Sequence, residues 1–163
     1  MGKENFPSLL GTELPRIIKG IAEKYNVPEY IANPDFQEKR LAPWHQFGLL
    51  THTKRVKDVY EFELPRILTS WEVKEEVEAH LSEKIGDLEK RTLFEGSIPL
   101  HDLGKIVCLN DTQFNRDHEA LSVSLIHEDP IKAKLDSYGL TKSQIDYLEG
   151  CIKAHDVLGK ELR

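Results

Sequence analysis

The sequence predicts an all-α fold, and three observations support this prediction. Apolar residues recur at intervals of three and four along several segments, which is the spacing of one helix face. Proline, glycine and capping residues separate these segments, and no run alternates convincingly between polar and apolar residues as a strand would. With 163 residues, of which 39% are hydrophobic, the chain is expected to form a single domain, residues 1–163, with a substantial core.

The first helix is expected to begin near Thr12, after an irregular lead-in over residues 1–11. Thr12 can cap this helix, and Pro15 would then lie in its first turn, where a missing N–H does no harm. Residues 29–43 contain two prolines and are expected to form a loop with a short helix, so residues 1–43 are interpreted as an N-terminal helical extension. The apolar stripe of the first helix consists of Ile17, Ile18, Ile21, Ala22 and Tyr25.

A second helix is expected from about residue 44 to residue 60, with His52 on its buried side and Pro65 interrupting the chain after it. A charged amphipathic helix is expected over about residues 71–90. Its outer face is rich in Glu and Lys and is interpreted as a solvated surface. Its inward residues are Val73, Val77, Leu81, Ile85 and Leu88.

The second half of the chain predicts four more helices. The first covers about residues 97–109, and the next begins at Asn115 or Asp117. A short helix ends at Gly139, which suits a C-cap, and residues 141–144 have the form of a capping box that opens the last helix. That helix carries Ile145, Leu148, Ile152 and His155 on one stripe.

Composition and charge restrict the classes of function. The net charge of −6 argues against broad nucleic-acid binding. No apolar run approaches the roughly 20 residues of a membrane span, and the first residues lack the apolar core of a signal peptide. Cys108 and Cys151 lie in apolar helical contexts and are expected to be free thiols, which indicates a reducing, cytoplasmic compartment. The sequence leaves the oligomeric state open.

One segment, residues 98–106, places His101 and Asp102 side by side in an apolar run. Burying both without partners would be costly, so they either pair with each other and their neighbours or hold a cation. Gly104 would let another segment come close, and Lys105 would lie one helical turn beyond the pair. Separate expected helices carry three further histidines: His52, His118 and His155.

The hexapeptide at residues 100–105, LHDLGK, resembles the signature of the HD-domain superfamily of metal-dependent phosphohydrolases. Residues 49–56 are similar to the first histidine helix of that family. Residues 117–122 and 152–155 resemble the third and fourth histidine motifs of its two-metal branch. The resemblance covers about residues 44–158. It implies an HD-domain helical bundle that hydrolyses phosphate esters at one or two metal ions.

The resemblance also implies the ligands of these ions. His52, His101 and Asp102 would bind a first metal, whereas His118 and His155 would bind a second one, with Asp102 bridging. Imidazole and carboxylate ligands suit iron, manganese, nickel, cobalt or zinc better than calcium, and magnesium is a further candidate. A purely structural role remains the alternative for each of these side chains.

The implied reaction is hydrolysis by metal-activated water, with Asp102 and Lys105 as catalytic residues. Lys105, Lys54 and Arg55 are candidate contacts to the phosphate of a small phosphorylated substrate such as a nucleotide. For Lys54 and Arg55, plain solvent-facing charge is an equal alternative. Surface or capping roles are expected for the remaining histidines: His45, His80 and His127.

The chain departs from the family pattern at two points. The interval between His52 and His101 is long for the family, and the charged helix expected at residues 71–90 fills it, so about residues 61–92 are interpreted as a charged helical insertion. The family closes its site with an Asp beyond the fourth histidine, and here the acids near His155 are Asp146 and Asp156. Two alternatives therefore stay open. One is an HD-type nuclease, because residues 116–122 resemble CRISPR-associated HD nucleases. The other is a catalytically impaired HD domain that regulates or binds, for which the missing Asp is the main argument.

Overall fold

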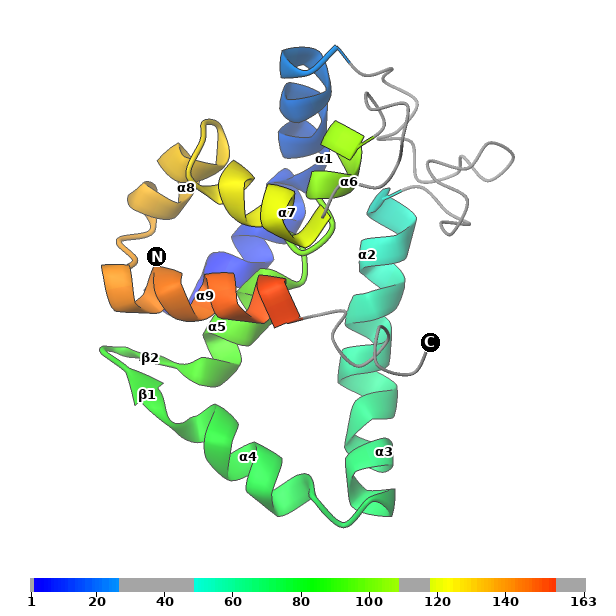
Figure 1. Cartoon of the computed structure of the whole chain (residues 1–163). Coiled ribbons are helices and arrows are strands. Elements are labelled where there is room, and N and C mark those ends of the chain that lie inside the picture. The colour runs from blue at the N-terminus through cyan, green and yellow to red at the C-terminus, as the bar shows by residue number, and fades with distance from the viewer. Residues whose placement is uncertain (1, 27–48, 109–117, 155–163) are drawn as a thin grey trace.

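The computed structural model describes residues 2–26, 49–108 and 118–154, and this part of the chain is all-α as predicted (Figure 1). The helices are η1 (Lys3–Asn5), α1 (Phe6–Lys24), α2 (Leu49–Asp58), the π-helix η3 (Val59–Glu63), α3 (Leu64–Ser70), α4 (Lys74–Ser82), α5 (Lys90–Ser97), α6 (Gly104–Cys108), α7 (His118–Ile126), α8 (Ile131–Ser137) and α9 (Lys142–Ala154). A two-stranded antiparallel hairpin, β1 (Lys84–Ile85) and β2 (Leu88–Glu89), is also present, although we predicted no strand.

Helix α1 begins earlier than predicted. It starts at Phe6, because Pro7 lies in its first turn and supplies the helix start that we assigned to Pro15. Pro15 lies inside the helix, and the Thr12 hydroxyl donates to the carbonyl of Ser8 (3.1 Å) rather than capping a helix start. The buried face of α1 consists of Phe6, Leu10, Leu14, Ile17, Ile18, Ile21 and Ala22.

This face of α1 belongs to the same core as the second half of the chain. Helix α1 packs on α5 and α6, α5 packs on α9, and α7 packs on both α6 and α9. Leu100, Ile106 and Leu148 are completely buried where these helices meet. The segment that we interpreted as an N-terminal extension therefore contributes directly to the packing that supports the second half of the chain.

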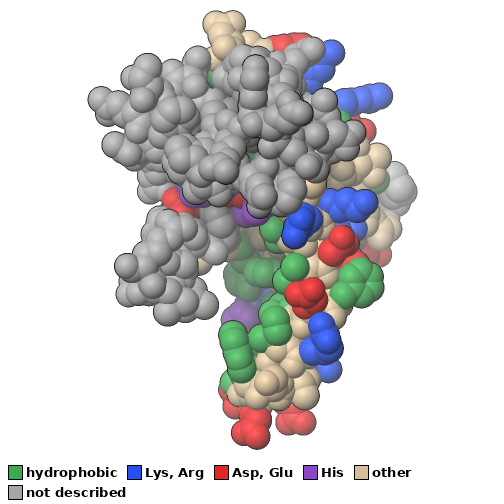
Figure 2. Space-filling view, turned by 90° about the vertical axis from the view of Figure 1, so that its right-hand side faces the viewer, with side chains coloured by type: hydrophobic (Ala, Val, Ile, Leu, Met, Phe, Trp, Pro, Cys, Tyr) green, Lys and Arg blue, Asp and Glu red, His purple; other side chains and the backbone are tan. Residues whose placement is uncertain are grey.

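Helices α2, η3 and α3 follow one another in a column on the right of Figure 1. We predicted that Pro65 interrupts the chain after the second helix, but the column continues through it. The π-helix changes the hydrogen-bond register, with the Leu64 N–H donating to the Val59 carbonyl, and Pro65 then lies in the first turn of α3. Val59, Phe62 and Trp71 are exposed along the column, and Figure 2 shows hydrophobic side chains among charged ones on this face.

The helix predicted over residues 71–90 is shorter than expected. Helix α4 ends at Ser82, and the β1–β2 hairpin replaces the rest of the predicted helix. Gly86 has a φ of 66°, which suits the tight turn, and Ile85 pairs with Leu88 across it. Leu88 is buried, as the helical stripe had predicted, although a strand rather than a helix carries it.

The predicted capping box at the start of α9 is confirmed. The Thr141 N–H donates to Gln144 Oε1 (2.9 Å), and the Gln144 N–H donates to Thr141 Oγ1 (3.2 Å). Gln144 Nε2 also donates to the Ile85 carbonyl (2.8 Å) and to Asp87 Oδ1 (2.9 Å), so one buried side chain joins α9 to the hairpin. The predicted C-cap at Gly139 is confirmed as well, with a φ of 75°.

The helix predicted over residues 97–109 is confirmed only from Gly104 onward, because a turn separates α5 from α6. Helix α5 ends at Ser97 and α6 begins at Gly104. Between them, bonds to the third preceding residue prevail, such as Leu100 N–H to the Ser97 carbonyl (3.1 Å). Pro99 has no N–H with which to continue α5, and this explains the break. The His-Asp pair therefore lies in a turn rather than on a helix.

Candidate metal centre

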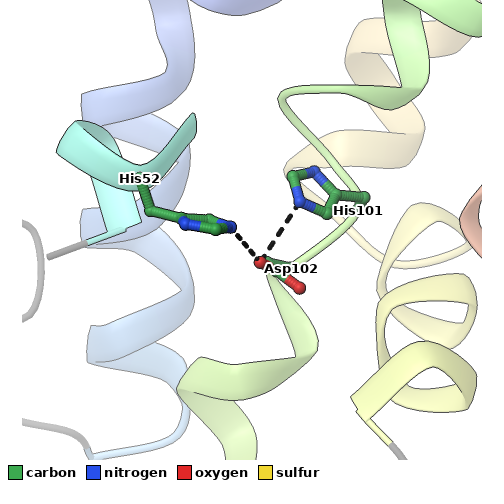
Figure 3. A group of neighbouring side chains, drawn as sticks. All are labelled: His52, His101 and Asp102. Carbon is green, nitrogen blue, oxygen red and sulfur yellow. Dashed lines mark ion pairs between the residues drawn. The ribbon is translucent and has the colours of Figure 1, made fainter. Parts of the chain in front are cut away.

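Basic side chains from separate elements surround the carboxylate of Asp102, which is 4% exposed. His52 Nε2, from α2, lies 2.9 Å from Asp102 Oδ2, and His101 Nε2 lies 3.2 Å from the same oxygen. His118 Nε2, from α7, lies 3.4 Å from the other oxygen, Oδ1. Lys105 Nζ lies 3.2 Å from Oδ2. Figure 3 shows the His52 and His101 rings approaching the carboxylate from opposite sides.

The position of His52 at the centre follows from the buried first turn of helix α2. Leu49 is buried and anchors the start of the helix in the core. His52 follows three residues later and therefore lies on the same face, and Val56, one turn further on, is also partly buried. The prediction that His52 lies on the buried side is confirmed in part, because the ring faces Asp102 while the side chain is still 32% exposed.

Two small residues bring α7 against the His-Asp turn. A Cβ at Gly104 would lie 2.2 Å from the carbonyl oxygen of His118 and 2.7 Å from the backbone nitrogen of Ser122. Ser122 Oγ accepts a bond from the Gly104 N–H (2.8 Å) and donates to the His101 carbonyl (3.0 Å). The prediction that Gly104 lets another segment come close is confirmed, and that segment is α7.

The orientation of the His101 ring defines which nitrogen faces Asp102. His101 Nδ1 lies 2.5 Å from the carbonyl oxygen of Ile98, and because a carbonyl only accepts, Nδ1 carries the proton. In the neutral ring, Nε2 then turns a lone pair towards Asp102 Oδ2. Two acceptors facing each other repel, so this contact needs either a second proton on the His101 ring or a cation between the two atoms.

The donor atoms fit a divalent transition metal. One ligand atom from each of His52, His101 and Asp102 lies within 4.8 Å of the other two. Ligands about 2.1 Å from a tetrahedral ion are roughly 3.4 Å apart, close to the 2.9 Å and 3.2 Å that separate the imidazole nitrogens from Asp102. Two imidazole nitrogens and a carboxylate oxygen also form a donor set that such metals favour.

The structure brings some predicted phosphate contacts to this centre and not others. Lys105 contacts Asp102 directly, and Arg55 lies one turn from His52 on the same side of α2. Lys54 is two residues from His52, about 200° around the helix, and it lines a cleft between α1 and α2 instead.

The other histidines have the positions expected for surface residues where the structure describes them. His80 is exposed and lies near Glu83 and the Tyr147 hydroxyl, while His127 pairs with Glu149. His45, His155 and Asp156 lie outside the described residues. Asp146 forms an exposed pair with Lys142 on α9 (3.1 Å).

Sequence reasoning gave no role to two residues at the centre. Glu119 is buried, and its Oε2 lies 3.8 Å from His118 Nδ1. Ser122 is also buried and bridges the turn, as described above. The signal that was available is their position, since Glu119 follows His118 directly and Ser122 lies one helical turn after it.

Cys151 supports the free-thiol prediction. It forms no disulfide within the described residues, and burial raises the pKa of its thiol to about 11, so it stays protonated near neutral pH. The side chain of Cys108 lies outside what the structure describes.

Comparison of the chain with protein-family models, with curated proteins and with solved structures gave no match. In the described part of the chain, no helix combines the length and the apolar character that crossing a membrane requires. The interpretation of the centre therefore depends on the contacts around Asp102 and on the resemblance of the sequence motif.

Proposed function

We propose that the chain is a metal-dependent phosphohydrolase of the HD-domain type, which acts on a nucleotide or another phosphate ester. One observation carries this proposal: the imidazoles of His52, His101 and His118 converge on the single buried carboxylate of Asp102. They come from α2, from the turn before α6 and from α7, so the cluster is a product of tertiary structure. A plain buried ion pair would need one basic partner for Asp102 rather than three imidazoles and an ammonium group.

His52, His101 and Asp102 would hold a first ion, and His118 together with the second oxygen of Asp102 would contribute to another. A divalent ion in such a site supplies water whose pKa is lowered to about 7, a nucleophile available at neutral pH. The protein keeps the ligands in place around it. The Ile98 carbonyl fixes the His101 ring, and Ser122 fixes the backbone of the turn.

Lys105 has two roles in this proposal. Lys105 is 8% exposed, and its Nζ lies 3.2 Å from Asp102 Oδ2, so it orients the carboxylate. It also adds a positive charge beside the ions. The resulting excess of positive charge at the site favours binding of an anionic group such as a phosphate. Arg55 is exposed at the edge of the same region and would extend this positive field towards solvent.

The test compares the parent protein with His101→Ala, Asp102→Asn and the control His127→Ala. The metal content of the purified proteins is measured, together with hydrolysis of a phosphodiester and of nucleoside monophosphates in added Mn²⁺. Both centre variants are expected to lose metal and hydrolysis, whereas the control removes a histidine paired with Glu149 at the surface and should behave like the parent. Equal metal in the parent and in both centre variants would show that the assignment is wrong.

A second function is favoured by the buried pair between Lys105 and Asp102. This pair balances the charge of the carboxylate without any ion, as a regulatory or binding HD domain would permit. The same experiment separates the two functions. Metal bound by the parent without turnover of any ester would favour the regulatory domain over the hydrolase.

A further inference from the structure

A cleft of about 470 Å³ lies between the first half of α1 and the column formed by α2 and η3. This volume is within the range of small-molecule sites, about 300–1,000 Å³. Its described walls are mixed: polar and charged side chains alternate with apolar ones, which are Pro7, Leu14, Pro15, Leu50, Ile98 and Pro99. A cavity of this size and mixed lining suits a small organic ligand that has both an apolar body and a polar group.

Most polar groups on the walls of the cleft already have partners. The Tyr60 hydroxyl donates to Glu95 Oε1 (3.1 Å), and Lys57 Nζ lies 3.8 Å from Glu61 Oε1. Burial, together with the charge of Glu95, raises the pKa of Tyr60 to about 12, so this phenol stays protonated as the donor to Glu95. Lys54 differs, because no described residue forms an ion pair with it. Its ammonium group is the charge on these walls that remains available to a ligand.

The cleft shares two walls with the candidate metal centre. Helix α2 carries His52 on one side and Lys54 about 200° around the helix. The turn after α5 places Ile98 in the cleft wall, while the Ile98 carbonyl accepts the bond from His101. The two sites therefore lie back to back and are chemically distinct: one has imidazole and carboxylate groups, and the other has mixed apolar and polar walls with one available cation.

We propose that this cleft binds a small organic anion, with its negative group at Lys54 and its apolar body against Leu14, Leu50 and Pro99. The proposal does not depend on hydrolysis at the metal centre, because binding in the cleft can be measured with no metal and no reaction. Amphipathic anions, an acidic group on an aromatic or aliphatic body, are the class that this combination of groups recognises.

The chain offers a variant that adds bulk at the wall of the cleft, at a position where a Cβ meets no other atom. Gly11 lies inside α1 and lines the cleft, and a Cβ there would meet nothing within 4 Å. A leucine at this position would therefore project into open space, and it also suits a helix better than glycine. Gly150, inside α9, has equally open surroundings and does not line the cleft, so Gly150→Leu is the matched control.

The probe is anilinonaphthalene sulfonate, an aromatic anion whose fluorescence reports an apolar environment. Titration of the full chain is expected to show one saturable site. Gly11→Leu should abolish that binding, and Gly150→Leu should leave it unchanged. Lys54→Gln should weaken it about tenfold, the size of one lost charge-assisted contact, whereas Lys57→Gln should have a smaller effect because Lys57 already pairs with Glu61.

A second probe, uncharged phenylnaphthylamine, has the same kind of apolar body without the sulfonate. Its binding should be lost in Gly11→Leu but unaffected by Lys54→Gln. The proposal is overturned if the sulfonate does not bind the parent, or if Gly11→Leu leaves its affinity unchanged. It is also overturned if the two lysine variants weaken binding equally. Loss of binding in the double variant Phe62→Ser and Trp71→Ser would place the probe on the exposed apolar side chains instead and would likewise overturn it.

Discussion

Gly104 and Ser122 determine how closely α7 approaches the His-Asp turn. The backbone of His118 lies where a side chain at Gly104 would lie, and Ser122 bonds to both sides of the turn. His118 reaches Asp102 because of this close contact. The geometry of the candidate centre therefore depends on two residues that are not themselves candidate metal ligands.

The substitution Gly104→Ala tests this dependence. The added Cβ would collide with backbone atoms, which cannot move aside as a flexible side chain can, so we expect a loss of about 2 kcal/mol or more in the free energy of unfolding. Urea unfolding measures this loss. The control is Gly150→Ala, which adds the same methyl group to a helix in open space and should be neutral or stabilise by up to about 1 kcal/mol. Equal stability of the two variants would contradict the account.

Individual residues at the centre were predictable to different degrees. The His101–Asp102 pair and the role of Gly104 were predictable, because polar residues inside an apolar run need partners and glycine permits close contact. The roles of Ser122 and Glu119 depend on how α7 packs on the turn, which no local pattern describes. Whether His155 joins the cluster stays a prediction.

At the scale of elements, the stripe of α1 was predicted reliably, whereas the stripe of the charged helix is only partly buried and the boundaries were misplaced. The buried stripe of α1 and the caps at Gly139 and Thr141 follow from local rules and are confirmed. The start of α1 was misplaced because two prolines, Pro7 and Pro15, each suit a first turn, and local rules do not choose between them. Tertiary packing of Phe6 favours the earlier start.

The hairpin was missed for a related reason. Ile85 and Leu88 fit a helical stripe, but Gly86 and Asp87 between them are also a two-residue hairpin turn. Gln144 decides between these alternatives, because its side chain bonds to the Ile85 carbonyl and to Asp87 from a distant helix. Contacts of this range are not visible in a local pattern.

The hairpin makes stability dependent on pH. Hydrogen bonds from Lys3 and then from Gln144 lower the pKa of Asp87 from its usual 3.8 to about 2. A carboxyl group with a depressed pKa contributes stability above its unfolded pKa, and that contribution is lost as the pH falls towards the folded value. The free energy of unfolding should therefore fall between about pH 4 and pH 2 partly through Asp87.

The matched variant for this effect is Asp87→Asn, which keeps the oxygen acceptor and removes the charge. Urea unfolding of the parent and of the variant across this pH range should show a shallower fall for Asp87→Asn. Parallel curves for the two proteins would mean that the contacts of Asp87 with Lys3 and Gln144 do not persist in solution.

At the scale of the whole molecule, one continuous core joins the N-terminal helix to the helices that carry the centre. Phe6 is 1% exposed, lies against Gly96 of α5, and its ring is 5.8 Å from that of Tyr138 beyond α8. Helix α1 also packs on α6, which begins directly after the His-Asp turn. The N-terminal segment should therefore be needed for the stability of the whole fold.

The substitution Phe6→Ala tests this requirement. Removing a fully buried aromatic side chain typically costs about 3–5 kcal/mol, which would remove much of the stability of a domain of this size. Thermal and urea unfolding measure the change. Phe62→Ala removes the same side chain from a position that is 69% exposed and should change stability by less than about 0.5 kcal/mol. Similar effects of the two substitutions would show that α1 is not part of the common core.

The most direct test of the account is X-ray absorption spectroscopy of the protein loaded with one equivalent of zinc. We predict nitrogen and oxygen ligands about 2.0–2.2 Å from the metal, with outer-shell scattering from at least two imidazole rings, and no zinc retained by His101→Ala. Cysteine sulfur in the first shell, or an unchanged imidazole signal in His101→Ala, would contradict the placement of the metal at Asp102.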